Sequence, residues 1–101
     1  MLSELQIHGL RWTILRTVMV GGHIGVTDQM ILNVAQAEYI GATRDLIRNE
    51  IDYLEARRLA RSERSEIEPW RVTLTRHGRD VVDYTVACEP GIRRPTRLEE
   101  R

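Results

Sequence analysis

Three side chains near the middle of the chain are of the kinds that contact nucleic acid. Arg44, Arg48 and Asn49 lie on one face of an expected helix. Arginine can donate two hydrogen bonds to guanine or to a phosphate, and asparagine can pair with the edge of adenine. Arg61 and Arg64 follow in an expected strand and turn, where they could bind phosphates. These five residues are the expected DNA-binding surface.

Acidic residues among these arginines leave a second interpretation open. Asp45 and Asp52 share the helix face, and residues 43–58 hold four arginines and four acids. Such a face could simply be solvated. The turn after Arg64 carries Glu66 and Glu68, and an acidic tip suits a protein partner better than the DNA minor groove, which attracts cations.

The remaining reactive side chains do not form a recognisable catalytic or metal site. His8, His23, His77 and Cys88 lack spacings such as Cys-x-x-Cys or His-x-x-x-His, which metal sites use. The sequence also lacks a glycine-rich phosphate loop and a nucleophile elbow. We therefore expect no metal, no cofactor and no enzymatic activity.

The length and composition of the chain limit the size of its hydrophobic core and the strength of any nonspecific binding to nucleic acid. The chain has 101 residues, a net charge of zero, and arginine as its only strongly basic residue type. Zero net charge predicts poor nonspecific affinity for nucleic acid, so DNA binding would depend on base contacts. No apolar run approaches the ~18 residues of a membrane span, so we expect no membrane partner. The single cysteine excludes an internal disulfide and favours the cytoplasm.

The elements that position these side chains follow from hydrophobic spacing and capping residues. Trp70, Val72 and Leu74 alternate with polar residues, as in a half-buried strand, and Thr75 then provides a helix cap. A turn of about three residues before Thr43 is typical of a helix-turn-helix. The expected helices are 3–19, 28–40, 43–58 and 76–87, and the expected strands are 23–26, 59–64 and 70–74. This order predicts an α+β, mainly α fold, a winged helix-turn-helix domain at 1–88 with a flexible tail at 89–101.

Four short segments give the chain a resemblance to a known family. They are Arg44-Asp45-Leu46-Ile47-Arg48, Tyr53-Leu54-Glu55, Leu74-Thr75-Arg76-His77-Gly78 and Pro90-Gly91-Ile92-Arg93-Arg94-Pro95. Over about residues 7–95 the chain resembles a family of small winged-helix proteins of Mu-like bacteriophages. The first three segments are also common in winged-helix regulators of the arsenic-repressor and multiple-antibiotic-resistance types.

The resemblance implies a DNA-binding-like domain in the cytoplasm of an infected bacterium, and the family has no established molecular activity. One departure is the Ala-Arg-Arg-Leu sequence at 56–59, which lacks the glycine that usually ends the recognition helix. We therefore expect that turn to be reshaped.

Two functions fit these observations. The first is a homodimeric DNA-binding regulator or accessory factor in DNA transactions, and the second is a module that binds a phage or host protein. A continuous arginine stripe on the third helix and wing would favour DNA, and a mixed surface with exposed apolar side chains would favour a protein. Helix 3–19 is apolar on more than one side, which predicts a homodimer through the first and last helices.

Overall fold

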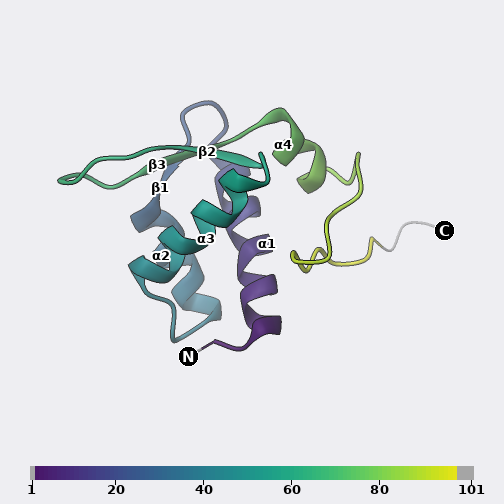
Figure 1. Ribbon diagram of the computed structural model, residues 1–101, viewed down its shortest axis with the longest axis horizontal. Coiled ribbons are helices and arrows are strands. Elements are labelled where there is room, and N and C mark those ends of the chain that lie inside the picture. Colours follow the sequence, from purple (N-terminus) through teal and green to yellow (C-terminus); the bar gives the residue numbers. More distant parts are fainter. Residues whose placement is uncertain (1, 98–101) are drawn as a thin grey trace.

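The computed structural model describes residues 2–97 as an α+β, mainly helical fold with a small antiparallel sheet (Figure 1). The elements follow the predicted order of helix, strand, helix, helix, strand, strand and helix. They are α1 (Glu4–Val20), β1 (Val26–Thr27), α2 (Asp28–Glu38), α3 (Arg44–Ala56), β2 (Ala60–Glu63), β3 (Arg71–Leu74) and α4 (Arg76–Val82). The first strand therefore lies slightly later than expected, and α4 ends well before residue 87.

Each helix begins at a hydroxyl side chain that caps it. Ser3 accepts a hydrogen bond from the backbone N–H of Gln6, whose side chain bonds back to Ser3. Thr27, Thr43 and Thr75 each accept from the N–H three residues further along. These bonds satisfy backbone donors that have no partner inside a helix. The predicted starts of the helices are confirmed to within a residue.

Helix α3 ends at a left-handed residue even though glycine is missing. Arg58 has a φ of 64°. The N–H of Leu59 donates to the carbonyl of Leu54 at 2.9 Å, and the N–H of Arg58 donates to Glu55 at 2.9 Å. This is the bond pattern of a Schellman motif. The expectation of a reshaped turn is therefore wrong, because arginine adopts the conformation that glycine usually takes, at a cost of roughly 1 kcal/mol.

The sheet has the order β1-β3-β2, and its two faces differ in character. Ala60, Val72 and Leu74 are buried and face α1, α2 and α3, which lie together on one side of the sheet in Figure 1. Arg61 pairs across the strands with Thr73 and alternates with those buried residues. Arg61 therefore lies on the outer face, which points away from α3.

The predicted flexible tail is packed against the domain over the part that the structure describes. Ile92 is buried in the core, with 4% of its surface exposed. The N–H of Arg93 donates to the carbonyl of His8 at 3.0 Å, and the guanidinium of Arg11 donates to the carbonyl of Gly91 at 2.9 Å. Residues 89–97 therefore make long-range contacts that the sequence does not show, and the flexibility of the tail in solution stays a prediction. Residues 98–101 lie outside the described residues.

Tyr84 ends α4 and anchors this tail. Its φ of 65° stops the helix, which explains why α4 is shorter than predicted. Its ring meets Trp12 edge-on with centroids 6.1 Å apart, and the guanidinium of Arg94 lies 4.3 Å from its centroid. The same guanidinium donates to the carbonyls of Val81 and Val86 at 2.8 and 2.9 Å. Arg94 thus ties the tail to one carbonyl in the last turn of α4 and to another in the segment that follows the helix.

The tail also covers the second apolar side of α1, which was the reason for expecting a homodimer. Trp12 is only 8% exposed beside the tail, so this side of α1 is filled within one chain. Leu5 and Val20 remain exposed near the two ends of α1. A dimer through α1 and α4 stays a prediction, which light scattering at micromolar concentration would test.

Candidate nucleic-acid interface

The outward face of α3 is set by its buried stripe. Ile47, Ile51 and Leu54 are fully buried against the rest of the domain, as predicted. The residues on the opposite side of the helix are exposed. They include Asp45, Asn49 and Asp52. Because two of the three are acids, the ridge that would enter a DNA groove is itself partly acidic.

Arg48, a predicted DNA contact, is engaged by a buried acid. Its Nε donates to Oδ2 of Asp28 at 2.6 Å, and Asp28 is fully buried in the first turn of α2. The other oxygen of that carboxylate, Oδ1, has no hydrogen-bond partner in the described part of the chain. A buried carboxylate is costly without a counter-charge. The charge of Arg48 therefore compensates Asp28 and is not freely available to a phosphate.

Arg64 is similarly engaged by α3. It donates to Oδ1 of Asp52 at 2.5 Å and to Oε1 of Glu55. Burial would lower the pKa of the Arg64 guanidinium, but the hydrogen bonds and charges of these two carboxylates outweigh burial and raise it. Arg64 follows β2 in the hairpin of β2 and β3, the wing expected from the sequence, and its charge is thus balanced by the helix beside it.

Trp70 lies where these two arginines meet, just before β3. The guanidinium of Arg48 is 4.5 Å from its ring centroid, and that of Arg64 is 4.1 Å from it. The ring also packs against the core, as expected for a sheet residue. Such cation–π contacts are worth about 0.5–1 kcal/mol each at exposed sites. Trp70 therefore ties the wing to α3 and is not an open surface on which a base could stack.

The other predicted contacts are exposed but do not form one surface. Arg44 bonds to Oε1 of Gln29 on α2, whose amide donates to Asn33 at 3.0 Å. Arg61 lies across the sheet on the outer face, away from Arg44 and Asn49. Gln29 and Asn33 were not predicted from the sequence. The available signal was two amide side chains four residues apart on the polar side of α2.

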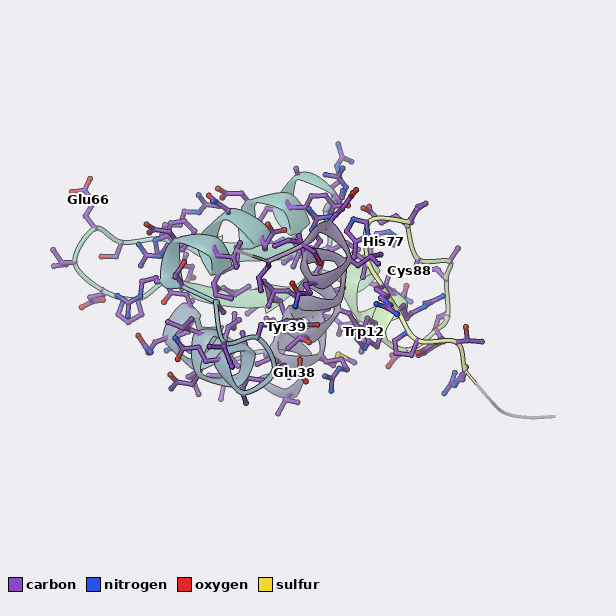
Figure 2. All side chains as sticks on the ribbon, turned by 90° about the horizontal axis from the view of Figure 1, so that it is seen from below. Trp12, Glu38, Tyr39, Glu66, His77 and Cys88 are labelled. Carbon is purple, nitrogen blue, oxygen red and sulfur yellow. The ribbon has the colours of Figure 1, made fainter. Side chains whose placement is uncertain are left out.

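The tip of the wing is acidic and apolar. Glu66 points away from the body of the domain in Figure 2, and Ile67 beside it is 90% exposed. The turn is held by Oγ of Ser65, which accepts from the N–H groups of Ile67 and Glu68 at 3.2 and 3.1 Å. We call the surface formed by α3 and residues 63–70 the α3–wing face. Because two of its arginines are paired with acids and its tip carries Glu66, this face is mixed in charge.

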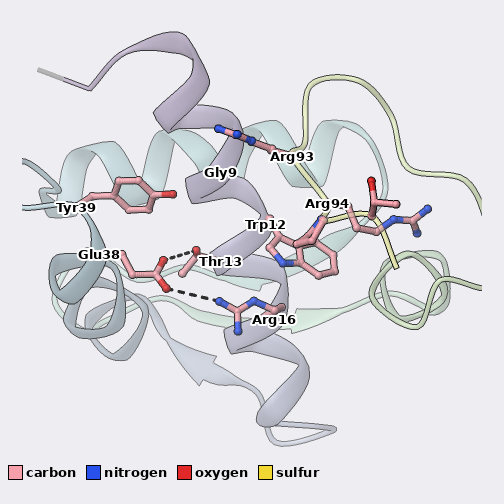
Figure 3. A pocket seen from close by; sticks show the side chains of 10 residues that line it. Gly9, Trp12, Thr13, Arg16, Glu38, Tyr39, Arg93 and Arg94 are labelled. Carbon is pink, nitrogen blue, oxygen red and sulfur yellow. Dashed lines mark hydrogen bonds and ion pairs between the residues drawn. The ribbon is translucent and has the colours of Figure 1, made fainter. Parts of the chain in front are cut away.

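A hollow of about 1040 Å³ lies between α1, the end of α2 and the tail (Figure 3). On one wall the hydroxyl of Thr13 donates to Glu38 at 2.6 Å, and Arg16 approaches Glu38 at 3.7 Å. Trp12 and Arg94 lie on the other side. Because the acid is already satisfied by neighbours, this wall offers no activated base or nucleophile.

A smaller hollow beneath the tail contains the single cysteine. Cys88 and His77 both line it and are labelled in Figure 2. Burial raises the pKa of the Cys88 thiol, although the charge of Arg94 opposes this. A raised thiol pKa means less thiolate at neutral pH, so the geometry does not activate Cys88. Within residues 2–97, no three His, Cys, Asp or Glu side chains gather closely enough to hold a metal.

Glu89 joins the tail to α3. Its carboxylate accepts from the hydroxyl of Tyr53 and from Nε of Arg57, the latter at 2.8 Å. Burial raises the pKa of Glu89, and the nearby charge of Arg11 opposes this. These contacts lie on the flank of α3 away from the wing, so they stabilise the domain and do not add to the α3–wing face.

Comparison of the chain with protein-family models, curated proteins and solved structures gave no match. Among the helices of residues 2–97, none is long and apolar enough to cross a membrane.

Proposed function

We propose that the protein is a winged-helix interaction module whose α3–wing face binds another protein. The carrying observation is that Arg48 and Arg64, the central arginines of this face, are balanced by carboxylates of the same chain. The element order and the β1-β3-β2 sheet support the winged-helix assignment. A mixed surface fits a protein partner better than the uniformly negative backbone of DNA.

The chemistry of the face defines the partner. An exposed isoleucine flanked by Glu66 and Glu68 suits an apolar pocket with a basic rim. Met30 and Val34, exposed at 52% and 42%, add apolar surface on α2, the helix that packs against α3. We therefore propose a basic protein partner, from a phage or its host.

The test is capture of proteins from lysate by the immobilised chain and by a wing variant, Glu66→Ser with Ile67→Ser. Both side chains are exposed and form no ion pair in the described part of the chain, so the variant should fold normally. A matched control, Ile24→Ser with Glu4→Ser, changes exposed residues of the same two types outside the α3–wing face. A protein retained by the wild type and the control but not by the wing variant supports the proposal. Equal retention by all three contradicts it.

A second candidate, sequence-specific DNA binding, is favoured by one observation. Arg44, Gln29 and Asn33 form a hydrogen-bonded chain across α2 and α3, and Asn49 is exposed on α3. Arginine, glutamine and asparagine are the side chains that most often bind guanine and adenine edges. Fluorescence anisotropy with duplex fragments of the cognate genome tests it. Saturable binding below about 10 micromolar, abolished in Arg44→Ala with Asn49→Ala, would establish this function in place of the first.

A further inference from the structure

We propose that the outer face of the sheet holds a binding site for phosphate groups, independent of the α3–wing face. Here the α1–β1 loop, β2, β3 and α4 enclose a hollow of about 360 Å³. It is lined by Gly22, His23, Arg61, Thr73, Leu74, Thr75, Arg76 and Arg79. Three guanidinium groups and an imidazole thus share one concave surface, and none of the lining residues is acidic.

The arginines of this hollow are not neutralised by the chain. Within residues 2–97, Arg61, Arg76 and Arg79 form no ion pair with a carboxylate. Five other arginines do form such pairs, and the whole chain has a net charge of zero. The positive charge of these three arginines is therefore not balanced locally, although the chain as a whole is neutral. An anionic ligand would supply the missing counter-charge.

The cationic groups sit on well-fixed elements. Nη1 of Arg79 donates to the carbonyl of Leu74 at 3.2 Å, which orients its guanidinium and leaves other N–H groups available. The loop that carries His23 closes through Gly25, whose φ is 83°; a Cβ there would lie 2.5 Å from the carbonyl oxygen of Val72. The loop is thus pressed against β3, so the backbone of the site requires little ordering when a ligand binds.

A second hollow extends the site along the sheet. It measures about 330 Å³ and shares His23, Arg61 and Thr73 with the first. Arg71 lines it, and its Nη1 donates to the carbonyl of Ile24 at 3.1 Å. Glu63 marks its far end. The basic groove formed by the two hollows is therefore longer than a single phosphate and could bind two in succession.

Phosphate is the ligand chemistry that fits this groove. A guanidinium presents paired N–H donors that match two phosphate oxygens, and such charge-assisted bonds are the stronger kind. Phosphates in series occur in nucleotide polyphosphates and in the nucleic-acid backbone. Both sources present the same phosphate group to the arginines, and experiment separates them.

The test is an NMR titration of the full chain with pyrophosphate and, separately, with a 12-nucleotide single strand. The site variant is Arg61→Ser with Arg76→Ser, whose side chains are exposed and form no hydrogen bond or ion pair in the described part of the chain. The control, Arg93→Ser with Arg97→Ser, removes the same charge from the exposed tail. Pyrophosphate should shift the amides of His23, Thr73 and Arg76, with at least tenfold weaker affinity in the site variant and less than twofold change in the control.

The two ligands identify the source of the phosphate. Tighter binding of the strand would assign the groove to a nucleic-acid backbone, and the slope of its salt dependence should then fall by roughly 1.4 in the site variant, because two arginines no longer reach phosphates. Tighter binding of pyrophosphate would assign the groove to a nucleotide. Shifts that do not saturate, or that are equal in the site variant and the wild type, would overturn the proposal. The wing variant should bind both ligands as the wild type does, so this result is separable from the proposed function.

Discussion

The α3–wing face and the outer face of the sheet both carry arginines, but in the described part of the chain only the first has arginines that form ion pairs with carboxylates. On the α3–wing face Arg48 and Arg64 meet Asp28, Asp52 and Glu55. On the outer face Arg61, Arg76 and Arg79 line a hollow together with His23 and hydroxyl side chains, and within residues 2–97 they form no ion pair. The number of arginines in a segment therefore does not predict its charge. The position of the carboxylates in the fold decides which arginines can attract a ligand.

The presence or absence of a paired carboxylate also separates arginines that stabilise the fold from arginines that are available to a ligand. An arginine that compensates a buried acid is part of the stability of the domain, whereas an exposed arginine without a partner contributes little to it. Substitutions on the two faces should therefore have opposite consequences. Substitution of Arg48, which compensates a buried acid, should change folding, and substitution of the unpaired arginines on the outer face should change binding.

The largest effect should follow from Arg48→Met. The variant leaves Asp28 fully buried without its counter-charge, which should lower the free energy of unfolding by about 3 kcal/mol. Urea denaturation followed by circular dichroism measures it. Arg61→Ala, the matched change on the outer face, should cost less than about 0.5 kcal/mol.

The double variant Asp28→Asn with Arg48→Met provides the control. Removing both charges should restore much of the stability that Arg48→Met removes, because no unpaired buried charge remains. Equal destabilisation by Arg48→Met and Arg61→Ala would show that the two faces do not differ in this way.

Two neighbouring arginines in the tail, Arg94 and Arg93, also differ in whether the chain engages the side chain, and the expected effects on stability are smaller. Arg94 donates to two carbonyls near the end of α4 and lies over Tyr84, whereas the side chain of Arg93 is exposed. Arg94→Ala should lower stability by about 2 kcal/mol, since hydrogen bonds from a charged donor contribute roughly 1.5–3 kcal/mol and partial exposure reduces this. Arg93→Ala should change it by less than about 0.5 kcal/mol.

The hydrogen-exchange rate of one backbone amide adds a local measurement to the comparison of Arg94→Ala with Arg93→Ala. The amide of Arg93 donates to His8 in the wild type, so it should exchange slowly, and it should exchange faster in Arg94→Ala. Fast exchange of this amide in the wild type would support the mobile tail that the sequence predicted.

Neutralising Asp52 and Glu55 should leave Arg64 on the α3–wing face without a counter-charge. Asp52→Asn with Glu55→Gln removes the charges that hold Arg64. The freed guanidinium should raise affinity for duplex DNA by about fivefold at 0.15 M salt, the effect of one added phosphate contact. Fluorescence anisotropy with a random duplex measures this. No change in affinity would mean that pairing does not limit the availability of Arg64.

The parts of the fold that local chemistry determines could be predicted from the sequence. Thr27, Thr43 and Thr75 mark helix starts because a cap depends on residues within one turn. The buried stripe of α3 and the alternation of β3 followed from periodicities of the same short range. The order of elements was predictable because each element carries its own signal.

The pairing of charges and the docking of the tail could not be predicted in this way. Asp28 is 20 residues from Arg48, and no periodicity links them. The tail contains only one buried aliphatic residue among those described, Ile92, and is held mainly by hydrogen bonds from distant residues such as Arg11. Four of the five predicted contacts, Arg44, Asn49, Arg61 and Arg64, are exposed. Whether an exposed charge is paired, as that of Arg64 is, depends on partners that only the folded chain brings together.

The smallest effect is expected at Arg58, which joins α3 to β2 and so links the two faces. Glycine adopts a φ of 64° without strain, whereas arginine does not. Arg58→Gly should therefore raise stability by about 0.5–1 kcal/mol, because relief of the left-handed strain exceeds the added entropy of the unfolded chain. The hydroxyl of Thr75 donates to the backbone carbonyl of Arg58 at 2.6 Å, and glycine keeps that acceptor. Arg58 does not line the basic groove, so affinity for pyrophosphate should stay within twofold of the wild type. A clear fall in that affinity would extend the groove to the end of α3 and remove the separation between the two faces.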